Sequence, residues 1–185
     1  CLTPQGSTAA SVGSFNNHWG VPLSLARMQR DAVYGIFELG MNHPGEIREL
    51  TSLVRPHVSI ITNIEPAHIG NFSSITEIAA AKAQTFEGMD AHGTAILNRD
   101  NALFHHLRTK AEDAGVTRIV SFGRHREADA RLVDCSLHAT CSAVTADIRG
   151  CEIDYCLAMP GMHWVMNSLA VLAAVSAAGA DVVQA

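Results

Sequence analysis

The stretch that decides the fold is Val58–Asn98, VSIITNIEPAHIGNFSSITEIAAAKAQTFEGMDAHGTAILN. Its two ends, VSIITN at 58–63 and TAILN at 94–98, are rich in aliphatic and β-branched residues and are typical of strands. Between them, SITEIAAAKAQTFEGM at 74–89 opens with a serine that is followed three residues later by Glu77, the capping-box pattern of a helix start. A strand, a helix and a strand in this order predict a right-handed crossover between parallel strands.

The same alternation extends to both sides of this unit. Upstream, AVYGIFEL at 32–39 is expected to be a buried strand, and PGEIRELTSLV at 44–54 a helix with proline at its first position and acids in its first turns. Downstream, a helix over 101–114 precedes a strand over 118–122. The sequence therefore predicts an α/β fold with a mostly parallel sheet flanked by helices.

The pattern changes after residue 130. Three strand-like runs, RLVDCSLHA at 131–139, SAVTADIR at 142–149 and CEIDYCLAM at 151–159, follow one another with turns between them. This arrangement favours a small antiparallel hairpin or meander, over about 130–160, on the edge of the domain. The apolar segment at 163–178 is expected to be a long helix, and the 185 residues to form one domain.

Composition narrows the classes of function. The formal net charge of −5 makes a basic nucleic-acid surface unexpected, and no apolar run reaches the roughly 20 residues that span a membrane. The five cysteines form no CxxC pair, so buried free thiols in a reducing cytoplasm are favoured over a disulfide framework or zinc site. The first residues resemble no signal peptide and contain no Met, which suggests missing upstream chain and a cytoplasmic location.

Polar side chains follow three of the expected strands. Glu38 ends the first, Asn63 and His68 follow the second, and Asn98 and Asp100 follow the third. Ligands of open parallel sheets bind at this edge, so a carboxylate there suits Mg²⁺, and a histidine suits metal or phosphate. Both residues also have a structural alternative. Glu38 could be a strand-end carboxylate that is hydrogen-bonded to loop amides, and His68 could be an ordinary surface histidine.

Three further groups of residues can be interpreted either as purely structural or as functional. Lys82 is a solvated helix lysine or, because its neighbours are small, one held partly neutral by burial. The segment SFNNHWGVP at 14–22 is a turn or a set of hydrogen-bonding groups for a polar substrate. His163 and Asn167 lie four residues apart at an expected helix start. Their side chains are expected either to contact a nucleotide base or to cap the helix.

Together these segments resemble the Mur ligase family. The residues that carry the resemblance are GSFNNHWGVPLSLARM, FELGMNHPGEIRELTSLVRPHVSIITNIEPAHIGNF, ITEIAAAKAQTFEGM, GTAILNRDN, SFG and PGMHWVMNSLAVLAA. The resemblance implies the central, P-loop NTPase-like ATP-binding domain of an ATP-dependent amide ligase. Its details point to the members that join D-Ala-D-Ala to UDP-MurNAc-tripeptide through an acyl phosphate in peptidoglycan precursor synthesis.

The resemblance also implies roles for single residues and the cofactors ATP and Mg²⁺. Glu38, His68 and a carbamylated Lys82 are the expected metal ligands and catalytic groups. The other expected contacts are to the nucleotide, by Asn98, Asp100, His163 and Asn167, and to the substrate, by Asn16, Asn17 and His18.

The sequence departs from the family pattern at two points. No GxxxxGK[ST] phosphate loop lies within these residues, and Trp164 stands where many members have Asn. The chain alone is therefore expected to have little or no ligase activity. Two alternatives remain open: another ligase of the family, such as the diaminopimelate-adding enzyme or folylpolyglutamate synthase, and a non-catalytic relative that serves as a binding module.

Overall fold

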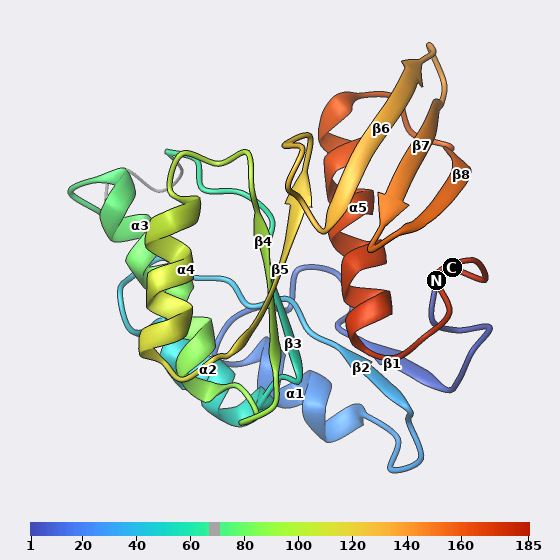
Figure 1. Ribbon diagram of the computed structural model, residues 1–185. Coiled ribbons are helices and arrows are strands. Elements are labelled where there is room, and N and C mark those ends of the chain that lie inside the picture. The colour runs from blue at the N-terminus through green and yellow to red at the C-terminus, as the bar shows by residue number, and fades with distance from the viewer. Residues whose placement is uncertain (67–70) are drawn as a thin grey trace.

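The computed structural model describes residues 1–66 and 71–185 (Figure 1). In chain order the elements are β1 (Thr8–Ala10), α1 (Gly20–Arg27), β2 (Tyr34–Ile36), α2 (Glu46–Val54), β3 (Val58–Ile61), α3 (Ile75–Ala83), the 3₁₀ helix η1 (Gln84–Gly88), β4 (Thr94–Asn98), α4 (Phe104–Asp113), β5 (Arg118–Gly123), β6 (Ala130–Leu137), β7 (Ser142–Ile148), β8 (Cys151–Leu157) and α5 (Met162–Ala177).

The main sheet has six strands in the order β3-β4-β5-β6-β7-β8. The pairs from β3 to β6 are parallel, and β6-β7 and β7-β8 are antiparallel. This confirms the expected fold class and the antiparallel meander, which projects from one side of the molecule in Figure 1.

One expected strand is shorter and lies elsewhere. Of the run 32–39 only Tyr34–Ile36 forms a strand, and it pairs in parallel with β1 instead of joining the main sheet. The prediction that Glu38 follows a strand of the main sheet was therefore wrong. The partner β1 was not predicted, because three residues of Thr and Ala carry no strand-like pattern.

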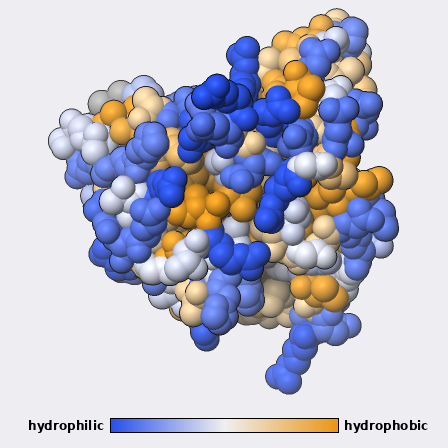
Figure 2. Space-filling view, viewed as in Figure 1, coloured by the Kyte–Doolittle hydropathy of each residue, from blue (hydrophilic) through white to orange (hydrophobic). Residues whose placement is uncertain are grey.

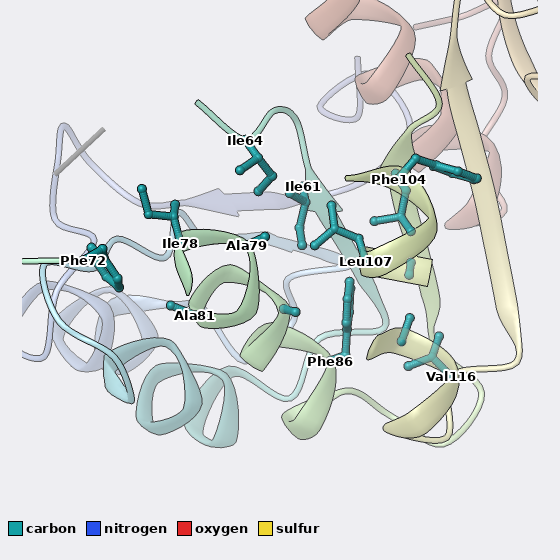
Figure 3. Close-up of a cluster of buried hydrophobic side chains, with 14 residues drawn as sticks. Ile61, Ile64, Phe72, Ile78, Ala79, Ala81, Phe86, Phe104, Leu107 and Val116 are labelled. Carbon is teal, nitrogen blue, oxygen red and sulfur yellow. The ribbon is translucent and has the colours of Figure 1, made fainter. Parts of the chain in front are cut away.

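Helices cover both faces of the sheet. In β4, Ala95 and Leu97 pack into the cluster of α3 and α4, whereas Ile96 packs into the cluster that contains α5. This alternation follows from the two-residue period of a strand, and it explains why β4 is apolar on both faces. Figure 3 shows the α3 and α4 cluster around Phe86, whose full burial stabilises the fold by about 1.5–3 kcal/mol.

Three expected helices begin or end elsewhere. Helix α2 begins at Glu46, not Pro44, because Gly45 takes a left-handed conformation (φ 96°) that interrupts the helix. The run at 74–89 divides into α3 and the tighter η1. Helix α4 begins at Phe104 instead of 101, because the Asn101 side chain accepts the Leu103 amide and forms a turn there.

The cysteines are free in the structure, but the expectation that they are buried was wrong. Cys1, Cys151 and Cys156 are exposed, and Cys135 and Cys141 are half-buried. Four of the five lie on or beside the meander, where one strand face is open to solvent. Among the described residues, no helix combines the length and hydrophobicity that a membrane crossing requires.

Candidate active site at the carboxyl edge of the sheet

Side-chain amides join the loops that follow β3 and β4. The Asn98 amide donates to the Thr62 carbonyl (3.1 Å), and Asn101 Nδ2 donates to Asn63 Oδ1 (2.6 Å). Asn63 Nδ2 in turn donates to Glu65 Oε1 (2.7 Å). These bonds fix the direction in which the Glu65 carboxylate leaves the loop.

Asp100 connects the same edge to β5. Its two carboxylate oxygens accept the backbone amides of Arg124 (2.7 Å) and His125 (2.9 Å). Gly123 makes this approach possible, because it has a φ of 152° and a Cβ there would lie 2.7 Å from Asp100 Oδ1. Asn98 Oδ1 accepts the Asp100 amide (2.9 Å). Both residues thus hold the strand-end loops, and their contact with a nucleotide stays a prediction.

Lys82 lies in the last turn of α3 and is half-buried. Burial lowers the pKa of its amine, and the charge of Glu65 opposes that shift. In the part of the chain that the structure describes, no carboxylate lies within ion-pair distance of this amine. Of the two interpretations of Lys82, its half-buried position and the direction of the pKa shift favour the buried lysine over the solvated one.

Glu38 lies against the segment before α1. Asn16 Nδ2 donates to Glu38 Oε1 (2.9 Å), and the Asn16 carbonyl accepts the Gly40 amide (2.7 Å). One carboxylate oxygen is thus oriented by a neutral donor, which leaves the negative charge on Glu38 uncompensated by that contact.

Asn17 and His18 have different surroundings from Asn16. Asn17 Oδ1 accepts the amides of Trp19 and Gly20 (both 3.0 Å), so its side chain caps the start of α1. The His18 ring lies 5.6 Å from the Trp19 ring, which is 77% exposed. Of the three expected substrate residues, the structure therefore gives a local structural role to Asn17 and leaves His18 at the surface.

The start of α2 connects the Glu38 loop to the Lys82 helix. Glu46 Oε2 accepts the amides of Asn42 (2.6 Å) and His43 (3.1 Å), which fold the loop after Glu38 back onto the helix. These two hydrogen bonds lower the pKa of Glu46, and the bond from Asn42 has the larger effect. Gly45 donates to Gln84 Oε1 (3.0 Å), two residues beyond Lys82.

The start of α5 carries the expected adenine-side residues. His163 is exposed, and its ring lies 5.3 Å from that of Trp164, which is 40% exposed. Asn167 is half-buried one turn further along. Hydrophilic residues gather over the upper ends of β4 and β5, at the same end of the molecule as this helix start (Figures 1 and 2).

The structure connects some of the expected residues but tests none of their catalytic or binding roles. The Glu38 loop and the Lys82 helix are joined through α2, but His68 lies outside the described residues. Among the residues that are described, no group of three His, Cys, Asp or Glu side chains forms a metal-binding cluster. Sequence reasoning missed Glu65, Asn101 and Gln84 as parts of this edge. Only the position of Glu65 between a strand end and a histidine gave a signal.

Comparisons with known proteins identify relatives of this chain. A family model described as the Mur ligase middle domain matches residues 1–175. The UDP-N-acetylmuramoyl-tripeptide--D-alanyl-D-alanine ligase of Rickettsia prowazekii is 35% identical over 173 residues, which is 94% of this chain and 38% of that protein. The enzyme of the same name from Escherichia coli is 32% identical, over 97% of this chain and 39% of that protein.

Solved structures show the same fold. A crystal structure of MurF from Acinetobacter baumannii has a TM-score of 0.93 and 28% identity, and the match covers 99% of this chain and 40% of that chain. MurF from Thermotoga maritima in complex with ADP has a TM-score of 0.85 at 19% identity, over 97% of this chain and 41% of that one. At that identity it supports the fold alone. The chain spans about two fifths of the length of these relatives.

Proposed function

The chain belongs to the Mur ligase family, and on that premise we propose that it is the ATP-handling domain of a D-Ala-D-Ala-adding ligase. The full protein would phosphorylate the carboxylate of UDP-MurNAc-tripeptide with ATP and let the amine of D-Ala-D-Ala displace the phosphate. The products are an amide, ADP and phosphate. The relatives that carry this name support the substrates, and peptidoglycan precursor synthesis in the cytoplasm is the setting that they suggest.

The observation that carries the proposal is the half-buried position of Lys82 in the last turn of α3, where burial lowers the pKa of its amine. A neutral amine adds CO₂ and releases one proton, which converts the side chain into an anionic carbamate with two oxygens. Such hard oxygens suit Mg²⁺. A scaffold protein has no need for a lysine held in this way, so the non-catalytic alternative is disfavoured.

The magnesium site that we propose draws on three side chains. Glu38 offers a carboxylate that Asn16 orients through one oxygen, and a carbamylated Lys82 offers two more oxygens. His68 is proposed as a third ligand. Bound Mg²⁺ would neutralise charge that builds up during phosphoryl transfer.

The other residues would bind and orient the substrates. We propose that Asn98, Asp100, His163 and Asn167 surround the nucleotide and that Asn16, Asn17 and His18 border the peptide substrate. For Asn98, Asp100 and Asn17 this role would act mainly through loop shape, because their side-chain oxygens already accept backbone amides. The exposed Trp164 offers an aromatic face beside His163.

The experiment is an ATP-dependent ligation assay on the protein at its full natural length. With UDP-MurNAc-tripeptide and D-Ala-D-Ala, Lys82→Ala should lower the rate by about 100-fold or more. The matched control is Lys110→Ala on α4, which is the only other lysine of the chain and is exposed. Equal loss in both variants, or activity with diaminopimelate or glutamate in place of D-Ala-D-Ala, would contradict the proposal.

Carbamylation itself has a separate readout. Protein equilibrated with ¹³C-labelled bicarbonate should show one carbamate carbon resonance, lost in Lys82→Ala and kept in Lys110→Ala. If the enzyme is active but shows no such resonance, the proposed ligation reaction stands and the proposed carbamate on Lys82 is contradicted.

A further inference from the structure

Two thiols lie on the outward face of the meander. Strands β7 and β8 pair so that Ser142 is opposite Leu157 and Ala143 is opposite Cys156. Cys141 directly precedes β7 and therefore lies diagonally across from Cys156. Because side chains on a strand alternate between faces, Cys141, Ala143 and Cys156 all point to the same side. Diagonal neighbours of this kind lie roughly 7–8 Å apart, and somewhat less between their Cβ atoms.

Neighbouring bonds hold the two cysteines in this relation. The buried Ser142 hydroxyl donates to the Met159 carbonyl (2.9 Å), which fastens the start of β7 to the end of β8. The His138 amide donates to the Cys141 carbonyl (2.9 Å) and closes the turn before β7. The side chain of Cys141 is the main cause that raises the pKa of Cys156, and burial is a lesser cause.

The other cysteines have no such partner by geometry. Cys151 is exposed on the same strand as Cys156 but five residues away, which is about 16 Å along an extended strand. Cys135 belongs to the opposite face, where it packs against the cluster that contains α5. The pair Cys141 and Cys156 is therefore singled out by the register of β7 and β8.

We propose that Cys141 and Cys156 are a redox-responsive dithiol that closes to a disulfide between the start of β7 and the end of β8. The oxidant is a low-molecular-weight disulfide of the glutathione class. One protein thiolate attacks it, forms a mixed disulfide and releases one small thiol. The second protein thiolate then attacks the protein sulfur of that mixed disulfide and releases the second small thiol. Overall, two protein thiols lose two protons and two electrons, and the oxidant becomes two thiols.

The link would join the two strands where the chain passes through Met159 and Pro160 into α5. In a reducing compartment the thiol form is the resting state, so the disulfide would form only when the thiol pool becomes oxidised. The exposure of Cys156 gives the oxidant access to the pair.

The test is peptide mapping of the protein at its full natural length. The protein is incubated with glutathione disulfide, its remaining thiols are alkylated, and the digest is analysed by mass spectrometry. A Cys141–Cys156 peptide that disappears on reduction is expected, with the other three cysteines recovered mainly as alkylated residues. Cys141→Ser should trap Cys156 as its glutathione adduct at least about 10-fold more than wild type, because the intramolecular second step is removed.

Two controls keep this result specific. Cys151→Ser, on the same strand, should leave the linked peptide unchanged. The proposal is overturned if wild type accumulates stable glutathione adducts at Cys141 and Cys156 without the link, or if the linked peptides come only from disulfide-joined dimers. Neither outcome depends on ligase activity.

Discussion

At the scale of single residues, Lys82 is under two opposed influences. Burial lowers the pKa of its amine, and the negative charge of Glu65 raises it. Replacing Glu65 with Gln should therefore lower the Lys82 pKa further, because the protonated form loses its favourable charge. Competitive acylation followed across a pH series measures this pKa at Lys82, and Glu112→Gln on α4 is the control. An unchanged or higher Lys82 pKa would contradict the expected influence of Glu65.

Glu46 makes stability depend on pH. Its pKa lies below the ordinary value of 4.5 in the folded protein, because it accepts the amides of Asn42 and His43. A lowered folded pKa means that the unfolded chain binds the proton more readily, so the stabilisation is present above pH 4.5 and is lost as pH falls through the folded pKa.

The free energy of unfolding of Glu46→Gln should therefore be lower than that of wild type at neutral pH, and the two should converge in acid. Denaturant titrations at a series of pH values measure the difference. Glu49→Gln, in the same first turn of α2, controls for the general loss of a charge at a helix start. A difference that stays constant with pH would show that the Glu46 carboxylate acts without its charge.

Single residues also show what the sequence could predict. The small neighbours of Lys82 allowed a buried amine of lowered pKa as one of two interpretations, and its half-buried position favours that one. The influence of Glu65 was not predictable, because it depends on how the loop after β3 is held by Asn63 and Asn101, which are 38 residues apart. Sequence spacing does not encode contacts over such separations.

At the scale of elements, Asp100 joins the loops after β4 and β5. Asp100→Ala should lower the free energy of unfolding by about 1–2 kcal/mol, because the Arg124 and His125 amides lose their acceptor. Denaturant titration measures the loss, and Asp113→Ala at the end of α4 is the control. Unchanged stability together with weakened nucleotide binding would instead assign Asp100 to direct nucleotide contact.

Elements with strong patterns were predicted well. The strand at 94–98 has the expected bounds, because a fully buried run of aliphatic residues between turns is distinctive. The strand at 32–39 was misplaced, since its apolar run does not say which sheet it joins. The start of α2 was misplaced because a proline that suits a helix start is followed here by a left-handed glycine.

At the scale of the whole molecule, the meander and the parallel sheet share one core. Helix α5 packs against both, with Val165 and Leu169 in the same cluster as Ile96 of β4 and Val144 of β7. The change of pattern after residue 130 marked the meander correctly. The sequence did not show that the meander continues the main sheet through the parallel pair β5-β6, because the register of strand pairs is a tertiary property.

The division of the strands into two sheets leaves exposed strand edges that favour self-association of the protein. Within the described residues, β2 pairs only with β1 and β3 pairs only with β4, so each has one edge of unbonded amides and carbonyls. Apolar side chains lie on these strands, with Ile36 49% and Ile60 37% exposed. Such edges recruit strands from other molecules. These 185 residues expressed alone should therefore self-associate as the protein concentration rises, and light scattering measures this association. Replacing Ile36 and Ile60 with lysine should suppress it.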